Sequence, residues 1–211
     1  MDLGVFALTV LCEEVGRTVA QVPVVPVLVG AAATLRRYGS DSQKDQWLPG
    51  IANGSTIVTS ALEEYNNDDP AKPGCSAQPV EGGYALSGTK ICVSQAQTAA
   101  RVLVSAHNGE ELIVALVDPK AAGVTLNRQE VTAGDTRHEL VMDKAQVSAE
   151  DIVATGGDAL VAMQWALQAT RGWMFRSANP MFHPCNFRDP DPATSWLPCL
   201  ANPLENSSIT G

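Results

Sequence analysis

The sequence has few basic residues, and this scarcity excludes several classes of partner. Lysine and arginine together number 14 against 23 aspartate and glutamate residues, which gives a formal net charge of −9 at pH 7. A chain with this charge gains no affinity for nucleic acid from counterion release, and an anionic membrane surface repels it. We therefore expect neither a nucleic acid nor a membrane as a partner.

Signals for export, membrane insertion and metal binding are also missing. The five cysteines contain no Cys-x-x-Cys pair, and their odd number fits neither a zinc site nor a disulfide framework. The chain starts Met1-Asp2-Leu3, where a secretory signal would carry basic residues. Its most apolar stretch, 19–35, contains two prolines, a glutamine and a glycine, and falls short of the roughly 20 apolar residues of a membrane-spanning helix. These features predict a protein of the reducing cytoplasm.

Common catalytic motifs do not occur either. There is no Gly-x-Ser-x-Gly elbow, no P-loop and no Gly-x-Gly-x-x-Gly fingerprint, so hydrolase, phosphoryl-transfer and Rossmann interpretations lack support. His107, His138 and His183 have no cysteine or carboxylate at ligand spacing. We expect each histidine to be a surface or turn residue rather than a catalyst, and we predict no metal site from them.

The first 55 residues carry the periodicity of helices. The apolar spacing predicts three of them, which run from Val5 to before Pro23, from about Pro26 to Gly39, and from Ser40 to Gly54. Ser40-Asp-Ser-Gln43 reads as a capping box, in which the hydroxyl and the amide side chain satisfy each other's backbone amides. Pro49 should kink the third helix.

From Thr56 the period changes to two and β-branched residues dominate. This predicts antiparallel strands near 56–62, 84–87, 90–94, 100–106, 111–117, 124–130 and 136–143. Asn108-Gly109 is the strongest hairpin signal and Gly82-Gly83 is a weaker one. Past Gly156-Gly157 a helical pattern restarts, loses coherence after about Trp173, and is followed by six of the thirteen prolines.

The predicted fold class is therefore α+β. We expect a helical part at 1–55, an antiparallel barrel-like or sandwich β domain at 56–155, the start of a helix at 156–175, and a divergent proline-rich tail at 176–211.

This order of elements, and several motifs along 3–165, resemble the acyl-CoA dehydrogenases. The motifs that carry the resemblance are Glu13-Glu14-Val15-Gly16-Arg17, Tyr38-Gly-Ser, Trp47-Leu-Pro49 with Gly54, Leu86-Ser-Gly-Thr-Lys90, and Val117-Asp-Pro119 with Gly123-Val124. The resemblance implies a flavoprotein that oxidises acyl-CoA thioesters with FAD, either as a homo-oligomer or as a hetero-oligomer with a dehydrogenase subunit.

Two segments resemble the family's flavin-facing motifs. Against Ala-Leu-Thr-Glu-Pro-x-x-Gly-Ser-Asp, Ala61, Leu62 and Glu64 match, whereas Glu63 replaces Thr, Tyr65 replaces Pro, and Asp68 and Asp69 replace Gly and Ser. The resemblance implies that this segment contacts the flavin ring and the dinucleotide. Added carboxylates beside phosphates cost about 1 kcal/mol or more at close range, so the substitutions predict weak FAD binding.

The second segment replaces Trp-Ile-Thr by Cys92-Val93-Ser94. Ser94 keeps a hydroxyl for flavin N5 or O4, whereas Cys92 removes an indole that would lie on the isoalloxazine ring. The cofactor-binding residues implied by the resemblance are Leu62, Glu63, Asp69, Cys92, Val93 and Ser94.

The acidic segment 63–69 has three open interpretations. It can be a solvated loop, a flavin contact, or a hard-cation site built from oxygen ligands, although its spacing fits no EF-hand loop. The residues alone do not choose among them.

The resemblance also implies a carboxylate base supplied by a C-terminal helical domain, which we do not find in the sequence. Asp158, the first carboxylate after Asp151, begins a helix and is expected to be a cap. We therefore leave the catalytic residues unassigned and expect a truncated form, inactive alone, produced by a frameshift or early termination. The alternative is a non-catalytic subunit or interaction module that pairs with a complete dehydrogenase.

Overall fold

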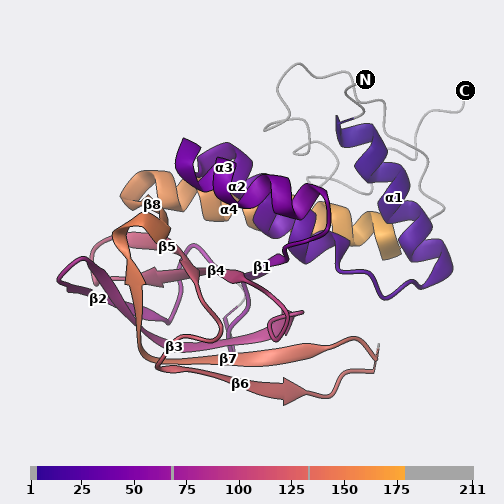
Figure 1. Cartoon of the computed structure of the whole chain (residues 1–211). Coiled ribbons are helices and arrows are strands. Elements are labelled where there is room, and N and C mark those ends of the chain that lie inside the picture. Colours follow the sequence, from indigo (N-terminus) through magenta and orange to yellow (C-terminus); the bar gives the residue numbers. More distant parts are fainter. Residues whose placement is uncertain (1–3, 68, 133, 179–211) are drawn as a thin grey trace, which may run out of the picture. The chain divides into compact units, whose positions relative to one another are not determined.

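The computed structural model of the chain describes residues 4–67, 69–132 and 134–178 (Figure 1). The chain divides into two compact units, one formed by Met1–Ala20 with Gln168–Gly211 and the other by Gln21–Leu167. Most of the predicted tail, including His183, lies outside the described residues.

The three helices predicted in the first 55 residues are confirmed, with one difference in winding. The first is α1 (Gly4–Thr18), the second is formed by η1 (Val25–Ala33) with α2 (Thr34–Tyr38), and the third is α3 (Asp41–Ala52). A further helix, α4 (Gly156–Ala178), follows the sheet. η1 runs directly into α2 but is wound as a wider π-helix, which no propensity predicts. The capping box is present, because Ser40 Oγ accepts from Gln43 N at 3.2 Å and Gln43 Oε1 accepts from Ser40 N at 3.1 Å.

An eight-stranded, mostly antiparallel sheet follows the helices. Its strands are β1 (Val58–Ala61), β2 (Ser76–Val80), β3 (Gly83–Ser94), β4 (Arg101–His107), β5 (Leu112–Val117), β6 (Val124–Gln129), β7 (Arg137–Ser148) and β8 (Ile152–Thr155), with a single 3-10 turn, η2 (Ala149–Asp151), between the last two. The order is β6-β7-β3-β2-β4-β5-β8, and β1 pairs in parallel with β4. The predicted α+β class, with a helical part followed by a mostly antiparallel β domain, is confirmed, and the sheet is not closed into a barrel.

Both predicted hairpin turns are confirmed. Gly109 and Gly82 have positive φ angles of 98° and 82° at the β4–β5 and β2–β3 turns. Two strands were not predicted: β2 contains Pro79, which strand propensity disfavours, and β8 has only four residues. The segments predicted at 84–87 and 90–94 form one strand, β3, because the interruption between them is a bulge.

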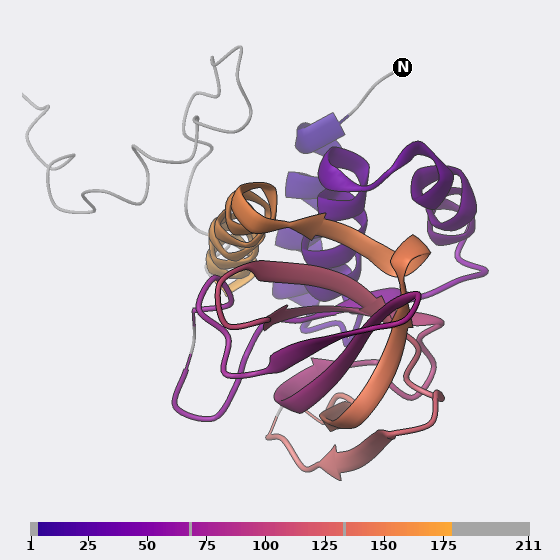
Figure 2. The same ribbon diagram turned by 90° about the vertical axis from the view of Figure 1, so that its left-hand side faces the viewer.

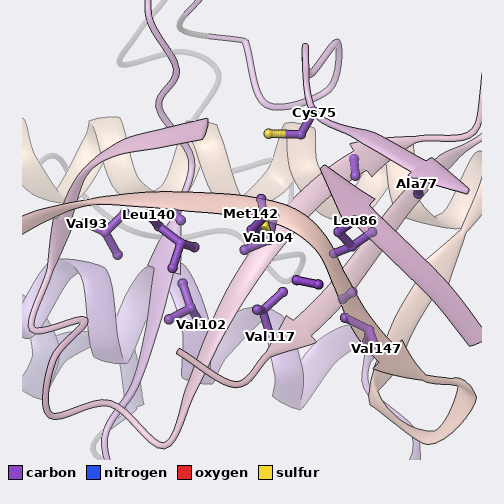
Figure 3. Close-up of a cluster of buried hydrophobic side chains, with 14 of the residues drawn as sticks. Cys75, Ala77, Leu86, Val93, Val102, Val104, Val117, Leu140, Met142 and Val147 are labelled. Atoms are coloured by element: carbon purple, nitrogen blue, oxygen red, sulfur yellow. The ribbon is translucent and has the colours of Figure 1, made fainter. Parts of the chain in front are cut away.

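Two apolar cores lie on opposite faces of the central strands. The core enclosed by the curved sheet contains Val93, Val102, Val104, Leu140 and Met142 (Figure 3). The second core lies between the sheet and the helices of unit Gln21–Leu167, which cover the side nearest β4, β5 and β8 (Figure 2). It contains Leu35, Trp47, Leu103, Leu116 and Met163. Alternate residues of β4 therefore enter different cores.

Helix η1 approaches β1 closely at a glycine. A Cβ at Gly30 would collide with Ser60 Oγ and lie 3.0 Å from Ser60 Cβ. The same Ser60 hydroxyl donates to Pro26 O at 3.1 Å. Glycine is therefore required at position 30 by the contact between helix and strand.

We predict that Gly30→Ala lowers the free energy of unfolding by about 1–3 kcal/mol, the usual cost of overpacking a tight contact. Gly157→Ala is the matched control, because a Cβ there meets nothing within 4 Å. Urea denaturation of both variants measures the difference, and equal midpoints would contradict the close approach.

Candidate functional site

The structure brings the two predicted flavin-facing segments together. Ile91 N, on β3, donates to Glu63 O at 2.9 Å, and the two residues form an antiparallel bridge. Glu63 is thereby placed next to the strand end that carries Cys92, Val93 and Ser94. The predicted site is thus one region of the fold rather than two separate loops.

The six predicted residues differ in what their side chains can offer a ligand. Leu62 packs against the helix-covered core, and Val93 lies in the sheet core with 1% of its surface exposed. The Asp69 carboxylate accepts from Ala71 N at 3.0 Å, so it stabilises its own turn. Ser94 is 6% exposed, and its hydroxyl makes no hydrogen bond among the described residues. Of these four, Ser94 has the side chain most available to a ligand.

Cys92 sits at a break in the ladder between β3 and β7. Its φ angle is 56°, an uncommon left-handed conformation for a residue with a side chain, and the register shifts between Lys90 and Val93. Its N–H donates to Gln129 Oε1 at 2.8 Å. Burial, and then the neighbouring Glu63 carboxylate, raise the pKa of the Cys92 thiol, so it is a poor nucleophile.

A polar row crosses three strands beside Cys92. Ser94 on β3 lies opposite Arg137 on β7, and Arg137 lies opposite Gln129 on β6. Directly opposite residues share a face of a sheet, so these three side chains lie in line. Arg137 Nε donates to Asp135 Oδ2 at 2.9 Å and also interacts with the Cys92 thiol. The row offers a guanidinium and a hydroxyl at the predicted site.

A buried ion pair lies directly behind this region. Lys90 Nζ is 2.6 Å from Glu64 Oε1, and the two side chains are 0% and 8% exposed. Burial alone would raise the pKa of Glu64, but the hydrogen bond and charge of Lys90, helped by Gly74 N–H, lower it below its ordinary value. Both residues align with family motifs, but the sequence alone did not predict that they form an ion pair. Their separation of 26 positions gives no local signal.

The ion pair bears on the three open interpretations of the acidic segment 63–69. Glu64 is not solvated, whereas Glu63 beside it is exposed. Within the residues that the structure describes, no three histidine, cysteine or carboxylate side chains are grouped in a way that could hold a metal ion. The segment therefore combines one structural carboxylate with one that faces solvent.

The expectation that the histidines lie on the surface or in turns is wrong for His138. Its side chain belongs to β7, opposite Val93, and the residue is 4% exposed. Its Nδ1 has no hydrogen-bond partner among the described residues. Burial, and then the nearby Arg128 guanidinium, lower its pKa. His107 is half-buried at the end of β4, where Nδ1 accepts from Gly109 N at 3.1 Å.

A cavity of about 550 Å³ lies beyond the acidic segment. Its walls come from three places: the loop at 71–73, the β4–β5 turn and the start of α4. Lys72 lies on one wall, and Gly156 and Gly157, the first two residues of α4, lie on another. Glu110 and Glu111 complete the rim, so the cavity carries charges of both signs.

Comparison with known proteins decides the family. The family model described as acyl-CoA dehydrogenase, N-terminal domain, matches residues 1–55. Acyl-CoA dehydrogenase FadE28 of Mycobacterium tuberculosis is 34% identical over 152 residues, which are 72% of this chain and 42% of that protein. The chain belongs to the acyl-CoA dehydrogenase family.

Solved structures of acyl-CoA dehydrogenases share the fold. A steroid ACAD variant, Tcur3481-Tcur3483, matches with a TM-score of 0.71 and 40% identity over 83% of this chain and 46% of that chain. The ChsE4-ChsE5 complex from Mycobacterium tuberculosis matches with a TM-score of 0.69 and 26% identity over 81% and 45%. The chain spans less than half the length of these relatives. None of the described helices of the chain is long and apolar enough to cross a membrane.

We predict that His138 makes the stability of this chain sensitive to mild acid. Because its folded-state pKa lies below the unfolded value of about 6.5, the unfolded chain binds the proton more readily, and stability falls as the pH drops below about 6.5. Glu64, whose pKa is lowered, adds acid sensitivity only below about 4.5.

Thermal melts of His138→Leu and wild type between pH 7 and pH 5 measure this contribution. The variant should lose less stability over that range, with His107→Leu as the control at a turn. Parallel pH profiles for all three proteins would contradict a neutral, buried His138.

Proposed function

We propose that this chain forms the flavin-facing part of an FAD-dependent acyl-CoA dehydrogenase, which introduces an α,β double bond into acyl-CoA thioesters. The observation that supports it most is the Glu63–Ile91 bridge, because it joins the two segments that resemble the family's flavin contacts. Family membership supports the class of reaction, and the joined segments support the position that we propose for the flavin ring.

The residues at the site fit the ring edge of a flavin. The edge of an isoalloxazine ring carries oxygen and nitrogen acceptors, and Ser94, a residue 6% exposed, has a hydroxyl that makes no hydrogen bond among the described residues. Arg137 lies opposite Ser94 and adds a cationic donor. When bound, FAD supplies the acceptor for the hydride that leaves the substrate. The chain's own part is to orient the ring and exclude water from one side.

The same site also explains why we expect weak FAD binding. Cys92 offers a smaller apolar surface than an indole and has its N–H engaged by Gln129. Glu63 places an exposed carboxylate beside Cys92, where it repels negative charge on a ligand. Both the smaller apolar surface and the added carboxylate weaken contacts with the ligand rather than contacts within the fold.

We place the acyl-CoA in the cavity at the start of α4. Phosphate groups are recognised by cations and by the free amides at helix N-termini, and Lys72 with the first turn of α4 offers both. Glu110 and Glu111 restrict the phosphates to the Lys72 side of the cavity. The free, buried thiol of Cys75, whose pKa burial raises to about 12, is consistent with the cytoplasmic location that we propose.

We assign no catalytic base. Glu64 is held by Lys90 and by backbone amides, so its carboxylate cannot turn toward a substrate. Glu63 lies at the exposed edge, where a base would not be shielded from water. The base required by the reaction is therefore a group other than these two carboxylates.

A second candidate function is a subunit that pairs with another dehydrogenase chain. It is supported by the two solved relatives named as pairs, Tcur3481-Tcur3483 and ChsE4-ChsE5. In this candidate the chain contributes its β domain to a site shared with the partner, and activity belongs to the complex.

Purification of the full chain with added FAD separates the candidates. We predict yellow protein that binds added FAD weakly, with Lys72→Ala weakening the binding of coenzyme A severalfold. Bleaching of the flavin by acyl-CoA would show in addition that the chain carries its own base. Glu81→Ala, an exposed change on the β2–β3 hairpin, is the control. Colourless protein that co-purifies with a dehydrogenase subunit would favour the second candidate. Colourless protein that binds neither FAD nor coenzyme A would contradict both.

We further predict that Glu63→Thr raises the affinity for FAD severalfold, because it removes a carboxylate beside the ring and adds a hydroxyl donor. Fluorescence titration with FAD measures the change, and Glu81→Thr controls for net charge. An unchanged dissociation constant would mean that residue 63 does not face the cofactor.

A further inference from the structure

We infer that Glu64 and Lys90 are positioning residues, which fix the two flavin-facing segments against each other before any ligand binds. The inference rests on the proposed function, because FAD is the ligand for which the segments are positioned. Its geometry comes from the ion pair itself. Glu64 follows Glu63 in the chain and Lys90 precedes Ile91, so the pair lies directly beside the Glu63–Ile91 bridge.

Glu64 collects donors from every side. Its Oε1 accepts from Lys90 Nζ at 2.6 Å and from Cys75 N at 3.3 Å. Its Oε2 accepts from Gly74 N at 2.6 Å and from Asn67 Nδ2 at 3.2 Å. One carboxylate thus joins the two ends of the 64–75 loop to each other and to β3.

Lys90 fixes the other side of the junction. Its ammonium is fully buried and also donates to Ser105 Oγ on β4 at 3.1 Å. A charge removed from water in this way needs its partner in place, because an unpaired buried ammonium costs several kcal/mol. Any opening of the loop that withdraws Glu64 therefore has to bring water to Lys90.

Stability alone does not require this pair. Apolar side chains of similar volume often give equal or greater stability at a buried ion-pair position, because they carry no desolvation cost. An apolar pair does not supply directional bonds, whereas the four donors on Glu64 fix its carboxylate relative to Asn67, the 74–75 backbone and β3. The pair is thus suited to setting geometry at the site.

The two roles are separated by comparing single and double variants. Glu64→Gln and Lys90→Met each break the pair, and Glu64→Leu with Lys90→Met replaces it by an apolar contact. Leu116→Ala is the matched control, since Leu116 lies in the second core, between the sheet and the helices, and its hydrocarbon side chain forms no part of the ion pair. Two quantities are measured on each folded protein: amide hydrogen exchange in 62–75 and 90–94, and the dissociation constant for FAD.

We expect the single variants to exchange faster in both segments and to bind FAD at least tenfold more weakly. The apolar double variant should recover the melting temperature of wild type but not its FAD affinity or its slow exchange. Leu116→Ala should lower the melting temperature and leave both site measurements unchanged.

Each contrary result has a distinct meaning. If wild type binds FAD and the double variant binds it equally well, the pair is only structural and the inference is overturned. If wild type does not bind FAD, the proposed function fails, and the exchange data still decide the inference: unchanged exchange in the single variants overturns it. If the single variants do not fold, the double variant gives the decision.

Discussion

Burial of β4 and β5 on both faces is the constraint on which unit Gln21–Leu167 depends. Val102 and Val104 enter the core enclosed by the sheet, whereas Leu103 between them enters the core beneath the helices. Every residue of β5 is buried. Burying apolar surface contributes about 25 cal/mol per Å², so two strands with two buried faces hold both the outer strands and the helices in place. The polar site can then occupy the far end of β3 without supporting the fold.

Polar groups in that region are almost all engaged, and the exceptions are informative. The ion pair behind the site satisfies its own donors and acceptors, and Gln129 takes the amide of Cys92. Two buried atoms in the region, Asp135 Oδ1 and His138 Nδ1, have no hydrogen-bond partner among the described residues. Buried polar groups are normally satisfied, so these two atoms mark positions where a water molecule or a ligand would add the missing partner.

Local sequence signals predicted the parts of the fold that local physics determines. The capping box at Ser40 and the turn at Asn108-Gly109 both occur as predicted, because each depends on neighbours within a few residues. The pairing of Glu64 with Lys90 and the left-handed backbone at Cys92 could not be predicted in that way, since both arise from strand register across the sheet. The burial of His138 could have been predicted from the sequence, because His138, Leu140 and Met142 alternate along one strand and the period of two places them on one face.

The parallel pairing of β1 with β4 has a consequence for how the chain reaches this structure. Val58 lies opposite Arg101, so β1 joins a strand whose residues are about 40 positions later in the sequence, while η1 packs on β1 through Gly30. Contacts between distant positions form late, because closing the intervening loop costs conformational entropy before the contact itself contributes any stabilising free energy. The first helices can form early as local structure, yet their docking onto the sheet waits until the ribosome has delivered β4.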